Sequence, residues 1–217
     1  MEDLRYHSAL TENEDDDFLQ GLSSSYRLVD EHLRSFRHQR LPGTLQWVIK
    51  LKEFQIWRMA SLDDAFSSDR ILWFRGISGI GKSHLAAYIV DLLMRRYPGS
   101  IVLYFFFRSH QDGLTSVSDM LQTLACQCDR SDIDARGILR ALNWETPEDE
   151  RDIKLLFEKL LFEPLRASQK EVFMVVDGLD EIDPSDHTVV HEVLHNLITL
   201  PSTRLLFLSK PTSVLAT

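Results

Sequence analysis

The chain has 217 residues, 44% of them hydrophobic, which is enough for one domain of ordinary size with a buried core. Its formal net charge of -9 argues against nucleic acid as a main partner, because nucleic-acid binding usually needs a basic face. The opening MEDLRYHSAL is too polar for a signal peptide, and the apolar run IVLYFFF is far shorter than a membrane helix. Its two cysteines, in the pattern C-Q-C, form no disulfide framework. We therefore expect a cytoplasmic protein with no membrane span.

Three regions follow one another along the chain. Residues 1–25 contain the acidic run TENEDDD and then GLSSS, which predict an acidic linker or a disordered terminus. Residues 26–67 carry helical apolar patterns interrupted at Pro42 and are expected to form a helical N-terminal segment. The core domain is expected over residues 68–217.

Strand-length apolar runs alternate with helical patterns from residue 68 onward. The expected strands are residues 71–76, 101–107, 171–178 and 203–209. The expected helices are residues 84–97, 116–128, 138–142, a helix containing residues 153–161, and 186–199. This alternation predicts an α/β fold, in which a parallel sheet lies between helices in a three-layer α/β/α arrangement.

The segment GISGIGKS matches the phosphate-binding pattern G-x-x-x-x-G-K-[ST] at every fixed position. It follows a predicted strand and opens a predicted helix, so its backbone N–H groups and the helix dipole would face phosphate oxygens. Lys82 would reach the β- and γ-phosphates, and Ser83 would bind Mg²⁺. The expected nucleotide-binding set is Gly76, Ile77, Ser78, Gly79, Ile80, Gly81, Lys82, Ser83 and His84.

The segment VFMVVDGLDE supplies the acidic half of such a site. Asp177 ends its apolar run and would hold Mg²⁺ through the metal's water shell, next to Ser83. Asp180 and Glu181 follow, and either could orient or deprotonate the attacking water, since the spacing does not decide between them. Lys210, after the last strand, is the candidate sensor of the γ-phosphate. Lys82, Asp180, Glu181 and Lys210 are thus the catalytic candidates.

The segment HEVLH, residues 191–195, matches the zinc metalloprotease pattern H-E-x-x-H on a predicted helix, with Glu192 as general base. No His, Asp or Glu follows His195 to serve as a third ligand. Apolar residues between the histidines indicate a helix packed against the sheet. We therefore rank a zinc protease last among the alternatives.

Read in order, GISGIGKSHLAAYIVDLL, YFFF, VVDGLDE and LFLSKP resemble the NACHT domain of STAND-class P-loop NTPases, especially that of fungal NLR-like proteins. The upstream segment PGTLQWVIKLKEFQIW is similar to the segment that precedes the NACHT core in that group. The resemblance covers residues 18–211. It departs from the family pattern at Lys210, where the family usually has arginine, which unlike lysine offers a planar fork to phosphate.

The resemblance implies a signalling switch in which ADP or GDP holds a resting state and ATP or GTP permits oligomerisation, as in fungal innate immunity or heterokaryon incompatibility. It implies that the partners are other domains of a larger protein or further copies of the chain. It also implies that the core is truncated before the helical and winged-helix subdomains that close over the nucleotide. Since we assign no arginine finger within the chain, and such a residue is worth about 10³–10⁵ in rate, we expect slow hydrolysis. A scaffold that binds nucleotide without hydrolysing it is the alternative, and the choice between ATP and GTP stays open.

Overall fold

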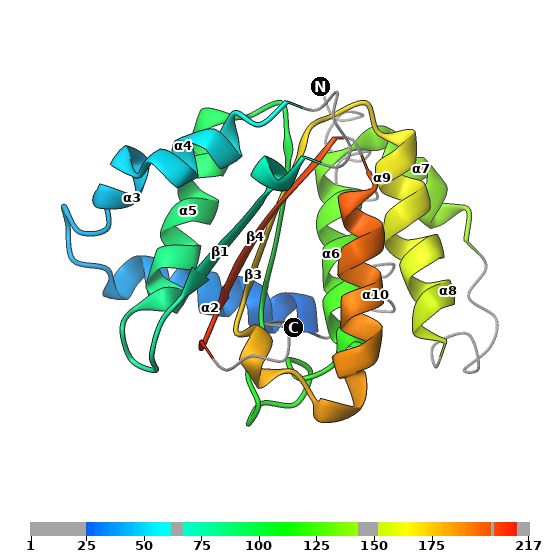
Figure 1. Ribbon diagram of the computed structural model, residues 1–217. Helices are drawn as coiled ribbons and strands as arrows, with labels where there is room; N and C mark the ends of the chain where they lie inside the picture. The colour runs from blue at the N-terminus through cyan, green and yellow to red at the C-terminus, as the bar shows by residue number, and fades with distance from the viewer. Residues whose placement is uncertain (1–24, 62–66, 143–151, 201, 212–217) are drawn as a thin grey trace, which may run out of the picture.

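In the computed structural model, which describes residues 25–61, 67–142, 152–200 and 202–211, a four-stranded parallel sheet lies between layers of helices (Figure 1). The strands are β1 (Ile71–Arg75), β2 (Ile101–Phe106), β3 (Val172–Asp177) and β4 (Thr203–Ser209). Their order is β1-β4-β3-β2, and every pairing is parallel. The α/β fold class of P-loop NTPases is therefore confirmed, and the carboxyl ends of all the strands lie along one edge of the sheet.

Helices cover both faces of the sheet and one of its edges (Figure 1). The α-helices are α2 (Ser25–Gln39), α3 (Trp47–Lys50), α4 (Lys52–Arg58), α5 (Lys82–Arg96), α6 (Val117–Ser131), α7 (Ile133–Arg140), α8 (Ile153–Phe157), α9 (Glu163–Ala167) and α10 (His187–Ile198). The short turns are η1 (Ser68–Arg70), the π turn η3 (Glu158–Phe162), η4 (Leu179–Glu181) and η5 (Pro184–Asp186). Helix α5 packs on β2, β3 and β4, whereas α10 packs on β4 and α6 packs on β2.

Two helices differ from the sequence-based expectation. The helix expected at residues 138–142 begins earlier, at Ile133, because the Asp132 carboxylate accepts hydrogen bonds from the backbone N–H groups of the first turn. The helix expected around residues 153–161 contains a π turn directly before Pro164. Because proline has no N–H, it cannot donate the α-helical hydrogen bond to the carbonyl four residues earlier. The wider π turn accommodates this missing hydrogen bond.

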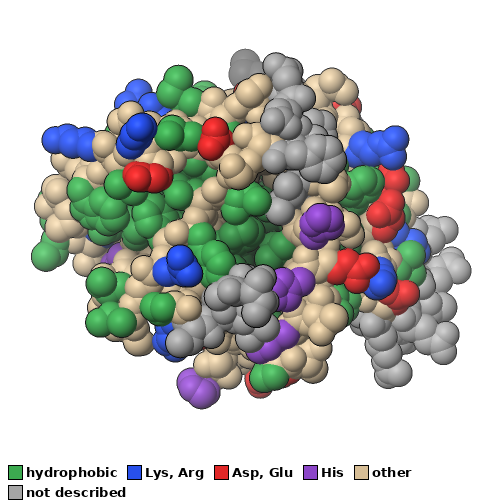
Figure 2. Space-filling view, in the orientation of Figure 1, with side chains coloured by type: hydrophobic (Ala, Val, Ile, Leu, Met, Phe, Trp, Pro, Cys, Tyr) green, Lys and Arg blue, Asp and Glu red, His purple; other side chains and the backbone are tan. Residues whose placement is uncertain are grey.

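The two edge strands of the sheet, β1 and β2, differ in how far they are buried. Strand β2 is fully buried, and the side-chain amide of Gln127 on α6 bonds both the N–H and the C=O of Tyr104, at 2.8 and 2.9 Å. Strand β1 is half-buried, and no strand among the described residues pairs with its outer edge. Hydrophobic side chains gather over β1 and the neighbouring α3 and α4 (Figure 2), where Trp47 meets Phe74 edge-on. The side chain of Gln127 thus closes the β2 edge of the sheet.

The described part of the predicted N-terminal segment, residues 26–61, packs on the same core as the sheet. The buried Trp57 indole donates a hydrogen bond to the C=O of Leu205 in β4, at 2.9 Å. The Arg204 guanidinium donates to the C=O of Ala60, also at 2.9 Å. Of the predicted linker, residues 1–25, only Ser25 is described, and it begins α2. Within the described ranges, no helix is both long and apolar enough to cross a membrane.

Candidate nucleotide-binding site

The GISGIGKS segment joins the carboxyl end of β1 to the first turn of α5, at the lower end of the sheet in Figure 1. Gly81 has φ of 96° and caps α5, a backbone conformation that glycine adopts without a Cβ penalty. The N–H of Gly76 donates to the C=O of Ser209 at 3.1 Å, which ties the loop to the end of β4. The N-terminus of a 15-residue helix therefore faces the strand ends, where it favours a bound anion.

Lys82 lies folded across its own loop. Its Nζ donates to the carbonyl oxygens of Gly76 and Ile77, at 2.7 and 3.0 Å. Both acceptors are uncharged, whereas a phosphate oxygen carries negative charge and would add a direct Coulombic attraction to the same ammonium. A phosphate group would therefore compete well for this ammonium.

The two predicted metal-binding residues meet, although 94 positions separate them in the sequence. The Ser83 hydroxyl donates to Oδ2 of Asp177 at 2.6 Å. Burial raises the pKa of Asp177 above its ordinary value, while the nearby Arg108 guanidinium and the Ser83 hydrogen bond partly oppose that rise. A buried carboxylate beside a hydroxyl is an oxygen donor set of the kind that Mg²⁺ prefers.

Gly178 brings the end of β2 against this carboxylate. It has φ of 79°, and a Cβ added there would lie 2.7 Å from the C=O of Phe107. Any side chain would therefore push the loop after β3 away from the residue that follows β2. The glycine of the predicted D-G-L-D-E motif thus permits a close approach of two strand ends.

Asp180 and Glu181, which the sequence left equivalent, have different surroundings. The Asp180 carboxylate accepts from the backbone N–H of Lys210 at 2.8 Å and pairs with its Nζ at 3.1 Å. This contact raises the pKa of Lys210. The Glu181 carboxylate accepts from the N–H of Ser109 at 3.2 Å, and its side chain is 30% exposed against 9% for Asp180. Asp180 is engaged by the predicted sensor lysine, whereas Glu181 is the more accessible acid.

Sequence reasoning missed Arg108. It follows the buried β2 strand, and its Nη2 lies 3.0 Å from Oγ of Ser83 and 3.2 Å from Oδ2 of Asp177. The Phe36 ring of α2 lies 5.6 Å from its guanidinium carbon and 5.1 Å from the ring of His84. A cationic residue directly after an apolar strand indicated Lys210, and the same pattern at the end of β2 could have indicated Arg108. Nothing in the local sequence of α2 pointed to Phe36.

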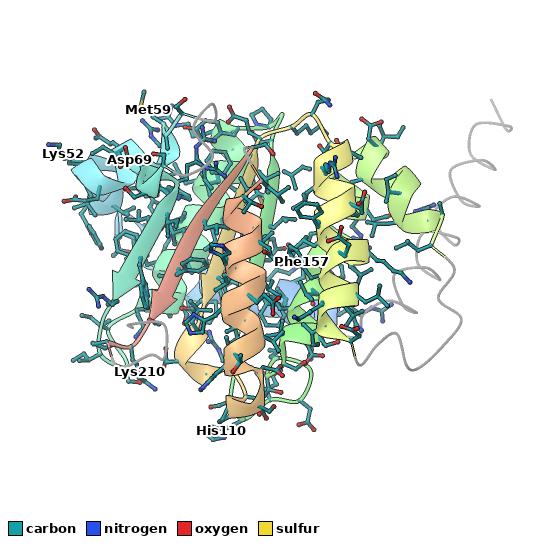
Figure 3. All side chains as sticks on the ribbon, turned by 45° about the vertical axis from the view of Figure 1, so that its right-hand side comes forward. Lys52, Met59, Asp69, His110, Phe157 and Lys210 are labelled. Carbon is teal, nitrogen blue, oxygen red and sulfur yellow. The ribbon has the colours of Figure 1, made fainter. Side chains whose placement is uncertain are left out.

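These residues line one cavity of about 360 Å³, a volume within the range of small-molecule sites. Figure 3 shows Lys210 and His110 at the same lower end of the molecule, where β4 and β2 end. Of the predicted site residues, the cavity is lined by Ser78, Gly79, Gly81, Lys82, Ser83, His84, Asp177, Asp180, Glu181 and Lys210. The remaining ones do not line it: Gly76 and Ile77 hold Lys82, and the Ile80 side chain is exposed.

The H-E-x-x-H segment lies on α10, and none of its residues lines the cavity. Its Glu192 carboxylate pairs with the Lys154 ammonium at 3.0 Å, which engages the group that a metalloprotease would need as its base. Among the residues that the structure describes, no group of three or more His, Cys, Asp or Glu side chains is placed to hold a metal ion.

The parallel sheet, the phosphate loop and the strand-end carboxylate together define the P-loop NTPase class of fold. The family model described as nephrocystin 3, N-terminal matches residues 43–210, which is more than half of the chain. The chain therefore belongs to that family.

No curated protein matches the chain. Among solved structures, Cdc6p from Pyrobaculum aerophilum is 17% identical, with 79% of this chain and 40% of that chain covered and a TM-score of 0.46. The C. elegans protein PCH-2 is 14% identical, with 77% and 36% covered and a TM-score of 0.34. The chain thus spans well under half of either structure, and similarities of this size do not transfer function.

The burial of Asp177 predicts a pH-dependent stability difference. Because its pKa is raised in the folded state, ionised Asp177 reduces stability as pH rises above the ordinary carboxyl value of about 4. The Asp177→Asn variant keeps an oxygen acceptor for Ser83 and loses the charge. We expect it to unfold at higher urea concentration than the wild type at about pH 7.5, with the gain vanishing near pH 4.

The control for this comparison is Asp112→Asn, which removes an exposed carboxylate outside the cavity lining. It is expected to change the urea midpoint little at either pH. A lower midpoint for Asp177→Asn at neutral pH would mean that Arg108 fully compensates the buried charge, contrary to the expectation.

Proposed function

We propose that the chain is a nucleotide-controlled switch module that binds ATP or GTP with Mg²⁺ and hydrolyses it slowly. The observation that carries this proposal is the 2.6 Å contact between Ser83 of the phosphate loop and Asp177 at the end of β3. A serine after the P-loop lysine and an acid on a neighbouring strand are the protein groups that hold Mg²⁺ in P-loop NTPases. Because Ser83 and Asp177 both line one cavity, the phosphate loop has a carboxylate nearby that can help to hold Mg²⁺. A glycine-rich turn alone would lack such a carboxylate.

The oxygen chemistry of this pair fits Mg²⁺, which takes hydroxyl, carboxylate and phosphate oxygens and keeps several waters. Ser83 and Asp177 would hold the ion, and when bound it would neutralise phosphate charge. Lys82 would exchange its loop carbonyls for phosphate oxygens. The N–H groups that open α5 would bind the same phosphates.

We assign the positioning of the attacking water to Glu181 rather than Asp180. The Asp180 carboxylate is neutralised by Lys210 and holds the end of β4 in place. Glu181 is more exposed at the cavity and has its carboxylate beside the residues that follow β2. Lys210 keeps its proposed role as phosphate sensor, because its side chain is 43% exposed on the cavity lining and could exchange Asp180 for a phosphate oxygen.

The switch function, with control of oligomerisation in fungal innate-immunity or incompatibility signalling, rests on the resemblance to NACHT domains. On this proposal residues 68–217 are the NTPase core, residues 26–67 its helical annex, and other domains or further copies of the chain its partners in the cytoplasm. Slow turnover follows if the rate gain of about 10³–10⁵ from an arginine finger has to come from a partner. A scaffold that never hydrolyses nucleotide is the alternative, and turnover distinguishes the two.

Lys82→Ala should strongly weaken nucleotide binding, because the loop then has no cation for the β- and γ-phosphates. We expect an affinity loss of about a hundredfold or more, consistent with losing charge-assisted contacts to phosphate. Titration of fluorescent ATP and GTP analogues measures it. The control is Lys52→Ala, which removes an exposed lysine at the opposite end of the molecule (Figure 3). Equal nucleotide affinities for the wild type, Lys82→Ala and Lys52→Ala would contradict the assignment of the phosphate loop as the nucleotide-binding site.

Glu181→Gln should lower the single-turnover hydrolysis rate by about a hundredfold or more and leave nucleotide affinity nearly unchanged, as expected for loss of a water-positioning acid. Asp180→Asn, which frees Lys210, is the matched comparison and should retain more of the rate. The reverse ranking would transfer the role to Asp180. A wild type that binds nucleotide but shows no turnover would favour the scaffold.

A further inference from the structure

The guanidinium of Arg108 lies against both groups that the proposed function assigns to Mg²⁺. Its Nη2 donates to Oγ of Ser83 at 3.0 Å and to Oδ2 of Asp177 at 3.2 Å. The side chain is 19% exposed, and that of Asp177 only 2%. Mg²⁺ binds oxygen ligands at about 2.0–2.1 Å, so an ion on Oγ of Ser83, with its water shell against Asp177, would take the space and the countercharge role of this nitrogen. The two cations therefore exclude each other.

The other contacts of Arg108 involve no metal ligand. Its Nη1 donates to the C=O of Phe107 at 2.6 Å and lies 3.8 Å from Oε1 of Glu181. Its guanidinium carbon lies over the Phe36 ring of α2, at 5.6 Å from the centroid. The hydrogen bond to the Phe107 carbonyl and the cation–π contact with Phe36 can hold a guanidinium after it leaves Ser83 and Asp177. The residue thus has two sets of partners, and only one of them competes with the metal.

We propose that Arg108 is a built-in competitor of Mg²⁺ at the Ser83–Asp177 pair. This inference rests on the proposed function. Without Mg²⁺, the guanidinium neutralises the buried carboxylate, so phosphates do not meet an uncompensated negative charge. When Mg²⁺ enters with nucleotide, Arg108 gives up Ser83 and Asp177 and stays at the cavity on the Phe107 carbonyl and the Phe36 ring, which leaves Glu181 available to the attacking water. Arg108 therefore makes nucleotide binding less dependent on Mg²⁺ and raises the Mg²⁺ concentration needed to complete the site.

A purely structural role for Arg108 predicts something different. An ion pair that only holds β2 and β3 together would lower the stability of the variant and leave its response to Mg²⁺ unchanged. The competitor role predicts a shift in that response whatever the change in stability. The two roles therefore separate in a Mg²⁺ titration of the folded variants.

The test is Arg108→Gln in the full chain, with fluorescent ATP and GTP analogues as probes. We expect the half-saturating Mg²⁺ concentration at fixed nucleotide to fall about tenfold, the size expected for removing one charge-assisted competitor. In EDTA, nucleotide affinity should fall by about tenfold, because the Asp177 carboxylate then faces the phosphates alone. Arg108→Lys keeps the charge without the planar fork and should lie between the wild type and Arg108→Gln.

The matched control is Arg95→Gln, which removes an exposed positive charge near the far end of α5 and should leave both quantities unchanged. Thermal unfolding establishes whether each variant is folded. If Arg108→Gln does not fold, the Mg²⁺ half-saturation and the EDTA affinity of Arg108→Lys decide the question. Unchanged Mg²⁺ half-saturation and EDTA affinity in the folded Arg108 variant would overturn the competitor role alone. A wild type that binds neither analogue, with or without Mg²⁺, would overturn the proposed function and this inference with it.

Discussion

The site is organised around the buried negative charge at the end of β3. A carboxylate removed from water is costly unless charged or hydrogen-bonding groups compensate it, and Asp177 receives such groups from other parts of the chain. The strand order makes this possible, because β3 lies between β2 and β4. Arg108 therefore reaches Asp177 from the end of β2, while Lys210 at the end of β4 holds the following loop through Asp180. A carboxyl group with a raised pKa on the lining of a cavity is typical of a functional site.

The N-terminal helices contribute to the site as well as to the core. The family match begins at residue 43, so α2 precedes it, yet its Phe36 lines the cavity and contacts both Arg108 and His84. Trp57 and Ala60 bond the backbone and side chains of β4 from the same segment. The position of Arg108 thus depends on a helix that lies outside the matched range, and a shift of α2 would change the countercharge available to Asp177.

The strands and the phosphate loop were predictable from the sequence, because each is determined by a local pattern of residues. Apolar runs located all the strands of the described sheet, and GISGIGKS with the strand-end Asp177 located the cavity. What local patterns could not determine depends on pairing between distant residues. The difference between Asp180 and Glu181 arises from Lys210, and the importance of Arg108 arises from a carboxylate 69 positions away. The early start of α7 and the π turn η3 were local effects, of Asp132 and Pro164, that the hydrophobic pattern did not reveal.

The central claim is that the cavity between the phosphate loop and Asp177 holds a nucleotide. Mass spectrometry of small molecules released from the purified, unheated protein tests it most directly, because it reports the base and the number of phosphates together. The account predicts a stoichiometric adenine or guanine nucleoside diphosphate or triphosphate. Protein that is free of nucleotide, and that also takes up none when incubated with ATP or GTP and Mg²⁺, would contradict it.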